Sequence, residues 1–366
     1  MNIQTMLSWA LYLSILVGCT FLMKKAQQLW KAGSKRYWWL LGTVFLALAV
    51  PVALRAETVG FDTHEYVEYY RYFLQVGNLN FRDNMEPLYE LFVRIAALAG
   101  NPHVVFILAA LATIFFMMAG LWWLRDQLDL GLVMFFYLCF FYLQTFNVVR
   151  QCFAVAILFF AFRFISERKF ILYVLFVYLA YLMHSAAIIG LLLYPMGSEK
   201  LSMKTKKLLC LLAALAVLIT ISPYLVPLLK EVTKISVFAA YGQHISDAHS
   251  RIGSSWLLRA VIIFGAILLS DSFRTKEGTR STALFATAIS LPFLIVNYLI
   301  PPIGRAGAYF SIFNVITFAS FAGRKTEKPF LPKMENALIV AFALVTFLMS
   351  LYSDGMELIP YSTFFS

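Results

Sequence analysis

Three arginines and one histidine interrupt apolar stretches of the sequence: Arg150, Arg259, Arg305 and His184. An ionisable residue inside an apolar segment costs about 2.5–3.5 kcal/mol at the centre of a membrane, so each one needs a partner or a task. A guanidinium binds phosphate or carboxylate through several N–H donors, and an imidazole can move a proton near neutral pH. These residue types suggest anion binding combined with acid–base chemistry.

Arg150 has polar neighbours on one helix face. Asn147 and Gln151 stand at helical offsets from it, in a stretch (130–162) that holds no other charge. At 1.5 Å per residue, Arg150 would lie about 5 Å below the outer end of its helix. The pattern favours a polar pocket for an anion; the alternative is an arginine that snorkels to lipid headgroups or caps a neighbouring helix.

The other three residues have similar alternatives. Arg305 follows Pro-Pro-Ile-Gly and shares a helix face with Tyr309, so it could be a simple interface anchor. Arg259 could snorkel, and His184, in Tyr-Leu-Met-His-Ser-Ala-Ala, could be a packed side chain.

The stretch 60–71 combines carboxylates with tyrosines, and Asp62, Tyr66 and Tyr69 share one helical face. Carboxylates beside aromatic rings suit sugars, which donate from hydroxyls and stack on rings. The alternative is a solvated amphipathic helix. The loop as a whole is expected to span 56–102, outside the membrane.

A second amphipathic helix is predicted over 86–99 in that loop. Glu86-Pro87 marks its start, because proline is favoured at the first helical position. Glu90 and Arg94 stand four residues apart and can pair. We expect the helix to lie on or dip into the outer membrane surface with one apolar stripe, formed by Leu88, Leu91, Phe92, Ile95 and Leu98.

The elements that must position these residues are membrane helices. The 366 residues are 61% hydrophobic and only 13% charged, with continuous apolar runs rather than the short alternating strands of a membrane barrel. The prediction is an all-α polytopic membrane protein, one domain over 1–366 with about twelve transmembrane or re-entrant helices. Ten segments are near 5–23, 37–55, 103–124, 131–146, 147–163, 206–229, 254–271, 282–299, 305–322 and 335–353.

The remaining two segments form a predicted short helical hairpin over 170–197, because basic clusters precede and follow it and both favour the cytoplasm. Its two arms, 170–183 and 185–197, would place His184 at the outer tip. The stretch 5–23 has lysines after it and none before, so it is expected to be a retained anchor with its N-terminus outside. In this topology the cytoplasmic stretches are 24–36, 125–129, 163–169, 197–207, 271–280 and 323–335. They hold 20 Lys and Arg and 8 Asp and Glu, whereas the rest of the chain holds 10 Lys and Arg and 11 Asp and Glu.

The net charge of +11 thus falls on one side of a membrane, and we predict no nucleic-acid partner. The four cysteines, Cys19, Cys139, Cys152 and Cys210, show no CxxC spacing and lie in or beside apolar segments. We expect neither a disulfide nor a zinc site, and no cofactor.

The sequence resembles the bacterial O-antigen and exopolysaccharide polymerases of the Wzy and EpsG type over most of its length. Six pieces in this order carry the resemblance: Gly60-Phe-Asp-Thr-His-Glu-Tyr66, Glu86-Pro-Leu-Tyr-Glu-Leu-Phe92, Asn147-Val-Val-Arg-Gln-Cys-Phe-Ala154, His184-Ser-Ala186, Arg305-Ala-Gly-Ala-Tyr-Phe310 and Ile359-Pro-Tyr361. It implies a GT-C-like glycan polymerase in the bacterial inner (cytoplasmic) membrane, active at the periplasmic or exterior face.

Such a polymerase transfers a growing glycan from undecaprenyl pyrophosphate to the next lipid-linked repeat unit. The implied partners are these lipid-linked donor and acceptor glycans, membrane lipid, a chain-length regulator and a flippase. In the expected mechanism Arg150 and Arg305 bind the donor pyrophosphate, with Arg259 as a weaker candidate, and Asp62, Glu86 or His184 orients or deprotonates the acceptor hydroxyl. The further residues expected to bind substrate or pyrophosphate are Asn147, Gln151 and Tyr309. No paired-carboxylate motif indicates a divalent ion, so we predict metal independence.

Two other functions are compatible with the sequence. A ligase would move a finished glycan from the same lipid to a different acceptor. A lipid-linked sugar flippase or secondary transporter would show repeated halves and charges at mid-membrane, whereas this sequence shows no repeat.

Overall fold

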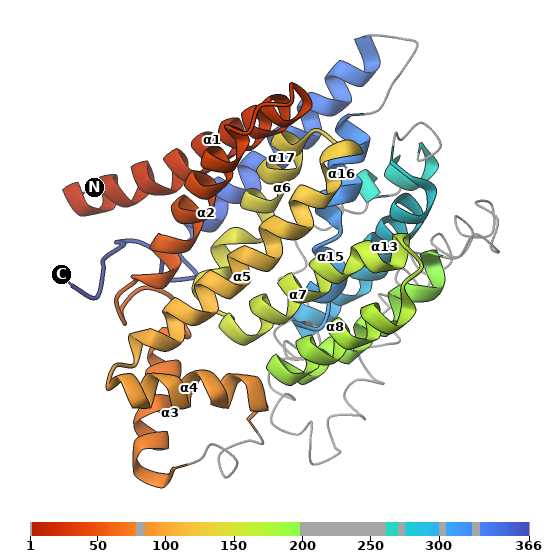
Figure 1. The fold of residues 1–366 in the computed structure, drawn as a ribbon. Helices are drawn as coiled ribbons and strands as arrows, with labels where there is room; N and C mark the ends of the chain where they lie inside the picture. Colours follow the sequence, from red (N-terminus) through yellow and green to blue (C-terminus); the bar gives the residue numbers. More distant parts are fainter. Residues whose placement is uncertain are drawn as a thin grey trace. The chain divides into compact units, whose positions relative to one another are not determined.

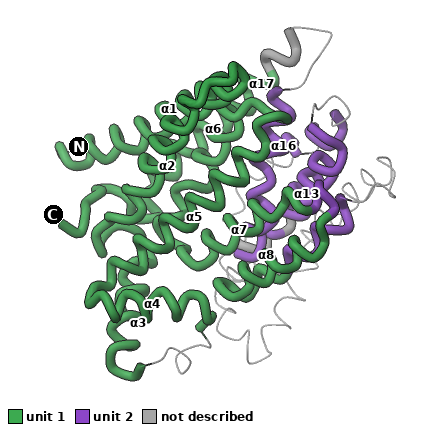
Figure 2. The backbone as a smooth tube through the Cα atoms, in the orientation of Figure 1, with its two compact units in different colours: residues 1–164, 169–188, 328–366 green, residues 165–168, 189–327 purple. Residues whose placement is uncertain are grey.

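The computed structural model describes residues 2–77, 85–197, 261–263, 265–269, 275–299, 305–323 and 330–365. Within these ranges the chain is helical apart from turns and one isolated bridge between Arg55 and Thr363, which confirms the predicted all-α class (Figure 1). The chain divides into two compact units, shown in Figure 2, which we describe separately.

Unit 1 comprises residues 1–164, 169–188 and 328–366. Helix α1 packs against α2 and α6, α2 packs against α5, and α6 packs against α17. Its elements are α1 (Ile3–Lys31), α2 (Tyr37–Ala53), α3 (Thr63–Val76), α4 (Pro87–Ala99), α5 (His103–Trp123), η2 (Leu124–Asp126), α6 (Leu130–Phe140), η3 (Tyr142–Phe146), α7 (Val149–Ser166), α8 (Phe170–Met183) and α17 (Phe330–Tyr352).

Four helical stretches of the described chain are long and apolar enough to cross a bilayer: Ile3–Lys31, His103–Asp126, Val149–Ser166 and Glu335–Tyr352. Helices α2, α6, α8 and η4 are shorter and also apolar. These findings support a membrane protein, and the count of twelve segments stays a prediction. In the most apolar stretch of α7, 78% of the residues are buried inside the protein, whereas the corresponding stretches of α1 and α17 are 33% and 28% buried. Helix α7 is therefore the interior helix of unit 1.

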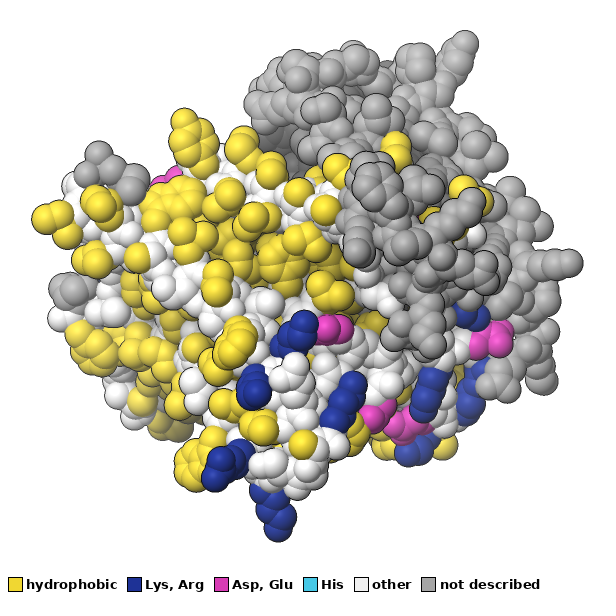
Figure 3. Space-filling view, turned by 90° about the horizontal axis from the view of Figure 1, so that it is seen from above, with side chains coloured by type: hydrophobic (Ala, Val, Ile, Leu, Met, Phe, Trp, Pro, Cys, Tyr) yellow, Lys and Arg dark blue, Asp and Glu magenta, His cyan; other side chains and the backbone are white. Residues whose placement is uncertain are grey.

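The outer helices of unit 1 expose apolar side chains that a soluble protein would bury. Ile3, Val17 and Trp39 are between 68% and 81% exposed. The face drawn in Figure 3 shows such hydrophobic side chains beside a group of Lys and Arg side chains. An apolar surface bordered by basic residues is typical of a helix bundle in contact with lipid.

Helix α1 is longer than the predicted run 5–23, since it continues to Lys31. The extra turns bring Gln27 to the connection between α5 and α6. Its amide donates to the carbonyls of Arg125 and Leu128, at 2.5 and 2.7 Å, and accepts from the N–H of Leu130 at 3.0 Å. One buried side chain therefore satisfies the backbone groups of this turn, which explains why the helix persists beyond its apolar run.

Helix α4 begins where the sequence predicts, with Glu86 as N-cap and Pro87 in the first turn. It packs against α3, α5 and α8 through a buried face that includes Tyr89, Val93 and Ala96. Part of the predicted apolar stripe faces outward: the side chains of Leu91, Ile95 and Leu98 are 48%, 38% and 90% exposed. This second apolar face suits contact with lipid.

Unit 2 comprises residues 165–168 and 189–327. Helix α13 (Glu277–Leu299) packs against α15 (Ala308–Ser311) and α16 (Asn314–Ala322), and the hydroxyls of Thr287 and Thr317 are hydrogen-bonded at 2.8 Å. The 3-10 helix η4 (Ser185–Gly197) begins in unit 1 and ends in unit 2. The predicted segment 206–229 and most of 254–271 lie outside the described residues.

Candidate functional site

An ion pair joins the start of α4 to the start of α7. The Glu86 Oε2 atom lies 2.7 Å from Nη1 of Arg150, and the two side chains are 12% and 25% exposed. Helix α7 begins at Val149, so Arg150 is its second residue and lies nearer the helix end than the predicted depth of about 5 Å. Glu86 can reach it because α4 starts at Pro87, which leaves Glu86 extended at the N-cap.

A sulfur atom and two tyrosines surround the guanidinium of Arg150. Nη1 also donates to the sulfur of Met85 at 2.8 Å, and the guanidinium carbon lies 5.4 Å from the centre of the Tyr89 ring. The hydroxyl oxygen of Tyr66, on α3, accepts a hydrogen bond from Arg150. Two polar groups here are buried without a hydrogen-bond partner among the described residues, the Nε–H of Arg150 and the hydroxyl of Tyr89. Such unpaired groups are rare in proteins and are typical of ligand sites.

The other oxygen of Glu86 is bound from the end of α8. This helix ends at Met183, and His184 is extended, with φ −157° and ψ 114°. The next residue therefore presents its backbone N–H, and Ser185 donates to Oε1 of Glu86 at 3.0 Å. We call Glu86, Arg150 and Ser185 the Glu86–Arg150 site.

The charge state of Glu86 follows from these contacts. Burial alone would raise the pKa of its carboxyl, but the charge of Arg150 and the N–H of Ser185 outweigh burial, with a smaller contribution from His184. The pKa of Glu86 consequently lies below its ordinary value, and the group is a carboxylate at neutral pH. The sequence singled out Glu86, Arg150 and His184 separately, and the structure brings them together.

Asp62 lies at the N-cap of α3, but its carboxylate does not cap the helix. Its backbone N–H instead donates to Oδ1 of Asn147 at 3.2 Å, and Nδ2 of Asn147 donates to the carbonyl of Met356 at 3.2 Å. Asn147 therefore joins the Asp62 loop, the entry to α7 and the segment after α17. Both ends of its amide bind protein backbone in this structure.

The segment after α17 fixes the Asp62 loop by backbone hydrogen bonds. Gly60 and Phe61 donate to the carbonyls of Glu357 and Met356, at 2.8 and 3.2 Å. Gly60 has φ +94°, and a Cβ atom there would approach the carbonyl oxygen of Phe146 to 2.5 Å. Only glycine fits this position, because the backbone of η3 already fills the space.

The aromatic face predicted for sugars is largely closed. Tyr66 and Tyr69 are each only 6% exposed, and both rings pack against Tyr89, with centroids 5.8 and 6.3 Å away. The carboxylate of Glu65, which accepts a hydrogen bond from the Tyr69 hydroxyl, belongs to an exposed residue. In this structure the rings support α3 and α4, and the carboxylates form the accessible part of the loop.

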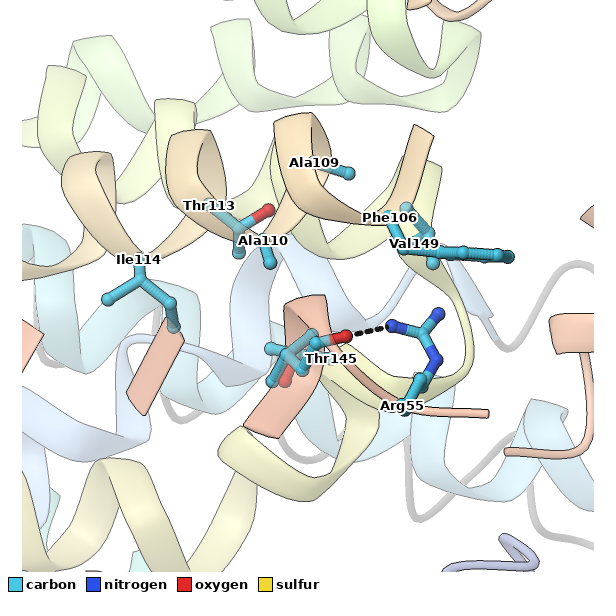
Figure 4. A pocket seen from close by; sticks show the side chains of 9 residues that line it. Arg55, Phe106, Ala109, Ala110, Thr113, Ile114, Thr145 and Val149 are labelled. Atoms are coloured by element: carbon cyan, nitrogen blue, oxygen red, sulfur yellow. Dashed lines mark hydrogen bonds between the residues drawn. The ribbon is translucent and has the colours of Figure 1, made fainter. Parts of the chain in front are cut away.

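Sequence reasoning missed a second buried arginine. Arg55 is 0% exposed, and it donates from Nε to the hydroxyl of Thr63 at 3.1 Å and from Nη1 to the carbonyl of Val52 at 2.6 Å. Its Nη2 has no partner in the described part of the chain. Arg55 also lines a small cavity together with residues of α2, α5, η3 and α7, shown in Figure 4. Its position at the end of the apolar run 37–55 is a signal that could have identified it.

The remaining predicted site residues lie elsewhere. Gln151 is 4% exposed in the first turn of α7. Arg305 is exposed and Tyr309 is 0% exposed, and both belong to unit 2, so the structure does not place them against the Glu86–Arg150 site. Arg259 lies outside the described residues.

Comparison with known proteins decides the family. The sequence model of the EpsG family matches residues 38–363, which include α2 to α17 and every residue of the Glu86–Arg150 site. The chain belongs to the EpsG family. No curated protein and no solved structure matches the chain. Membership of the EpsG family, together with the apolar helices, supports a membrane protein with a polysaccharide-polymerase type of function.

Proposed function

We propose that this EpsG-family protein joins undecaprenyl-pyrophosphate-linked oligosaccharide repeat units into O-antigen or exopolysaccharide. The reaction would take place at the outer face of the bacterial cytoplasmic membrane, in a GT-C-like arrangement of helices. The donor would be the growing glycan on its lipid and the acceptor the next lipid-linked unit. The energy would come from the bond between sugar and pyrophosphate.

The observation that supports this proposal best is the Glu86–Arg150 site. It combines a cation, a backbone N–H and a carboxylate at the ends of three helices. A donor with a pyrophosphate needs cationic and N–H donors that offset the charge developing on the leaving group. An acceptor hydroxyl needs a nearby base, and Glu86 and His184 are the candidates at this position.

In the proposed reaction Arg150 binds the donor pyrophosphate, and the unpaired Nε–H beside it supplies a further donor. The acceptor oxygen attacks the anomeric carbon, the bond from that carbon to the pyrophosphate oxygen breaks, and the electron pair leaves with the lipid pyrophosphate. The hydroxyl proton passes to a carboxylate or imidazole. Asp62 lies in the loop that Asn147 fixes, and we propose that it orients the acceptor. Arg305 is proposed as a further pyrophosphate ligand on its sequence motif alone.

The proposed orientation places the N-terminus and the loop 56–102 outside. Glu68 of α3 and Lys35, between α1 and α2, would then lie on opposite sides of the membrane. A membrane-impermeant maleimide added to intact spheroplasts should label Glu68→Cys and leave Lys35→Cys unlabelled until the membrane is opened. The reverse labelling pattern would contradict the orientation.

The function is tested in cells that lack the gene, by gel analysis of surface polysaccharide. Wild type should restore a ladder of chain lengths, and the null strain should show glycan of a single repeat unit. A ladder in the null strain would favour the transporter. If the null strain makes glycan of normal chain lengths that stays on the lipid carrier and is not transferred to the final acceptor, the ligase would be favoured.

Site variants in the same strain test the residue roles. Arg150→Ala, Arg305→Ala and His184→Ala should each abolish or shorten the ladder at equal membrane levels. The matched control is Arg94→Ala, which removes an arginine of α4 that is 52% exposed and, among the described residues, pairs with Glu90 of its own helix and contacts the Phe73 ring. A full ladder from Arg150→Ala would contradict the proposed donor site.

A further inference from the structure

The Glu86 carboxylate occupies a position that suits a substrate anion. Oε2 accepts from Nη1 of Arg150 at 2.7 Å, and Oε1 accepts from the N–H of Ser185 at 3.0 Å. His184 makes a smaller contribution that also lowers the pKa of this carboxyl. A guanidinium, a backbone N–H and an imidazole are the groups that bind phosphate oxygens in proteins, so a phosphate and this carboxylate are alternative occupants of one set of donors.

The site is reachable and has unused capacity. Arg150 is 25% exposed and Glu86 12%, so the pair is sheltered but open at the surface of unit 1. The Nε–H of Arg150 and the Tyr89 hydroxyl lack hydrogen-bond partners in the described part of the molecule. A carboxylate has two oxygens and both are engaged, whereas a pyrophosphate carries several more acceptor oxygens and could bind these groups as well.

We propose that Glu86 is an internal competitor for the donor site: the donor phosphate displaces its carboxylate from Arg150 and Ser185, and the displaced carboxylate becomes the base for the acceptor hydroxyl. This inference rests on the proposed function. The proton of the attacking hydroxyl moves to the Glu86 carboxylate while the anomeric carbon–oxygen bond of the donor breaks and its electron pair leaves with the lipid pyrophosphate. The protonated Glu86 then loses its proton to solvent and returns to Arg150.

The exchange would couple the strength of the base to the presence of the donor. In the paired state Arg150 and Ser185 hold the pKa of Glu86 below its ordinary value, against the opposite effect of burial, which makes it a weak base. Once a phosphate takes those donors, their effect on the carboxylate is lost and the negative phosphate raises its pKa. Glu86 therefore gains basicity only when the donor is bound, which would limit unproductive proton transfer in the empty enzyme.

The test measures binding of farnesyl pyrophosphate, a short soluble polyprenyl pyrophosphate, to the purified full chain in nanodiscs by isothermal titration calorimetry. Removing the competing charge in Glu86→Gln should tighten binding about tenfold, equivalent to roughly 1.4 kcal/mol, and should abolish turnover of the lipid-linked repeat unit. Glu86→Ala should also bind more tightly and serves as a second variant. The matched control is Glu90→Gln, one helical turn away, whose affinity should stay within about twofold of wild type.

Each outcome separates the exchange from the proposed function. Tighter binding in both Glu86 variants, with loss of binding in Arg150→Ala, supports the exchange. Unchanged or weaker binding in folded Glu86 variants, with loss in Arg150→Ala, overturns the exchange and leaves the donor site in place. Unchanged binding in Arg150→Ala overturns the donor site itself and the exchange with it. Thermal melting of each variant confirms that it is folded.

Discussion

Helix α4 and its N-cap supply the glutamates of two Glu–Arg pairs one helical turn apart, and the pairs differ in the origin and the exposure of the arginine. Glu90 pairs with Arg94 on the same helix at 2.5 Å, and their side chains are 10% and 52% exposed. Glu86 pairs with Arg150 of another helix, 64 residues later in the chain, and Arg150 is 25% exposed. The first pair follows from local spacing alone, whereas the second requires the tertiary fold.

The comparison indicates which of the two pairs better suits a binding site. A pair at positions i and i+4 of one helix contributes about 0.3–0.5 kcal/mol to stability, and Arg94, which is 52% exposed, donates from both Nε and Nη2 to Glu90. The Glu86–Arg150 pair joins two elements, borders the buried, unpaired Nε–H of Arg150 and the Tyr89 hydroxyl, and accepts an N–H from a third element. Polar groups that are sheltered and incompletely satisfied are expected at sites of binding.

Reversing the charges within each pair should give the largest difference between them. In Glu86→Arg/Arg150→Glu the attraction is retained, but the cation no longer lies at the start of α7 and Ser185 N–H meets a positive group. We expect polymer formation by purified protein to fall at least about 100-fold, as when a transition-state donor is removed. Glu90→Arg/Arg94→Glu should keep activity within about threefold. Recovery of activity in the first double variant would mean that the pair serves only to join the helices.

Removing the arginine of each pair should also reveal a difference in how much the two pairs contribute to the free energy of unfolding. Removing one partner of a fully buried pair costs about 3–5 kcal/mol, and the partial exposure of Arg150 and Glu86 reduces the expected loss to about 1–3 kcal/mol for Arg150→Ala. Arg94→Ala should lose less, about 1 kcal/mol or below, because Arg94 is 52% exposed, although the substitution leaves Glu90, which is 10% exposed, without its partner. Unfolding of both variants in the same detergent mixture measures the difference. Equal losses would show that the tertiary pair adds no more than the local one.

The stabilising effect of Glu86 should depend on pH. Its folded-state pKa lies below the ordinary value of 4.5, because Arg150 and Ser185 outweigh burial. The contribution is therefore fully present above pH 4.5 and is lost as the pH falls through the folded-state pKa. The difference in melting temperature between wild type and Glu86→Gln should be constant from pH 7 to 5 and shrink below pH 4.5. A difference that grew on acidification would show that the carboxylate is not stabilised by a cation.

Removing divalent metal should have the smallest effect. If Arg150 supplies the positive charge for the leaving group, activity in excess EDTA should stay within about twofold of the untreated enzyme. Radiolabelled lipid-linked repeat units in liposomes provide the assay. Loss of activity in EDTA that magnesium restores would show that the cation at the leaving group is a metal.

Local rules were enough to predict one of these pairs and part of the other. Proline after Glu86 predicted the start of α4, the spacing of Glu90 and Arg94 predicted their contact, and an arginine in an uncharged stretch identified Arg150. The all-α class followed from continuous apolar runs, and the structure confirms it for the residues described.

Contacts between distant parts of the chain could not be predicted in this way. No periodicity connects Glu86 to Arg150 or to the N–H of Ser185, since the distance in sequence leaves their meeting to the packing of α4, α7 and α8. Asn147 was predicted to bind substrate, because an amide beside an arginine suits a polar pocket. In the structure its amide binds the backbone of Asp62 and Met356. A donor or acceptor satisfied by backbone from another segment has no signature in the residue pattern.

Gly60 shows how a position without any functional group can constrain the sequence of this chain. Its φ of +94° and the carbonyl of Phe146, 2.5 Å from where a Cβ would be, exclude every other residue unless the chain before α7 moves. Such a movement would be transmitted through Asn147 toward Arg150. In a saturation library selected for polymer, position 60 should therefore accept fewer substitutions than the exposed Phe61 beside it.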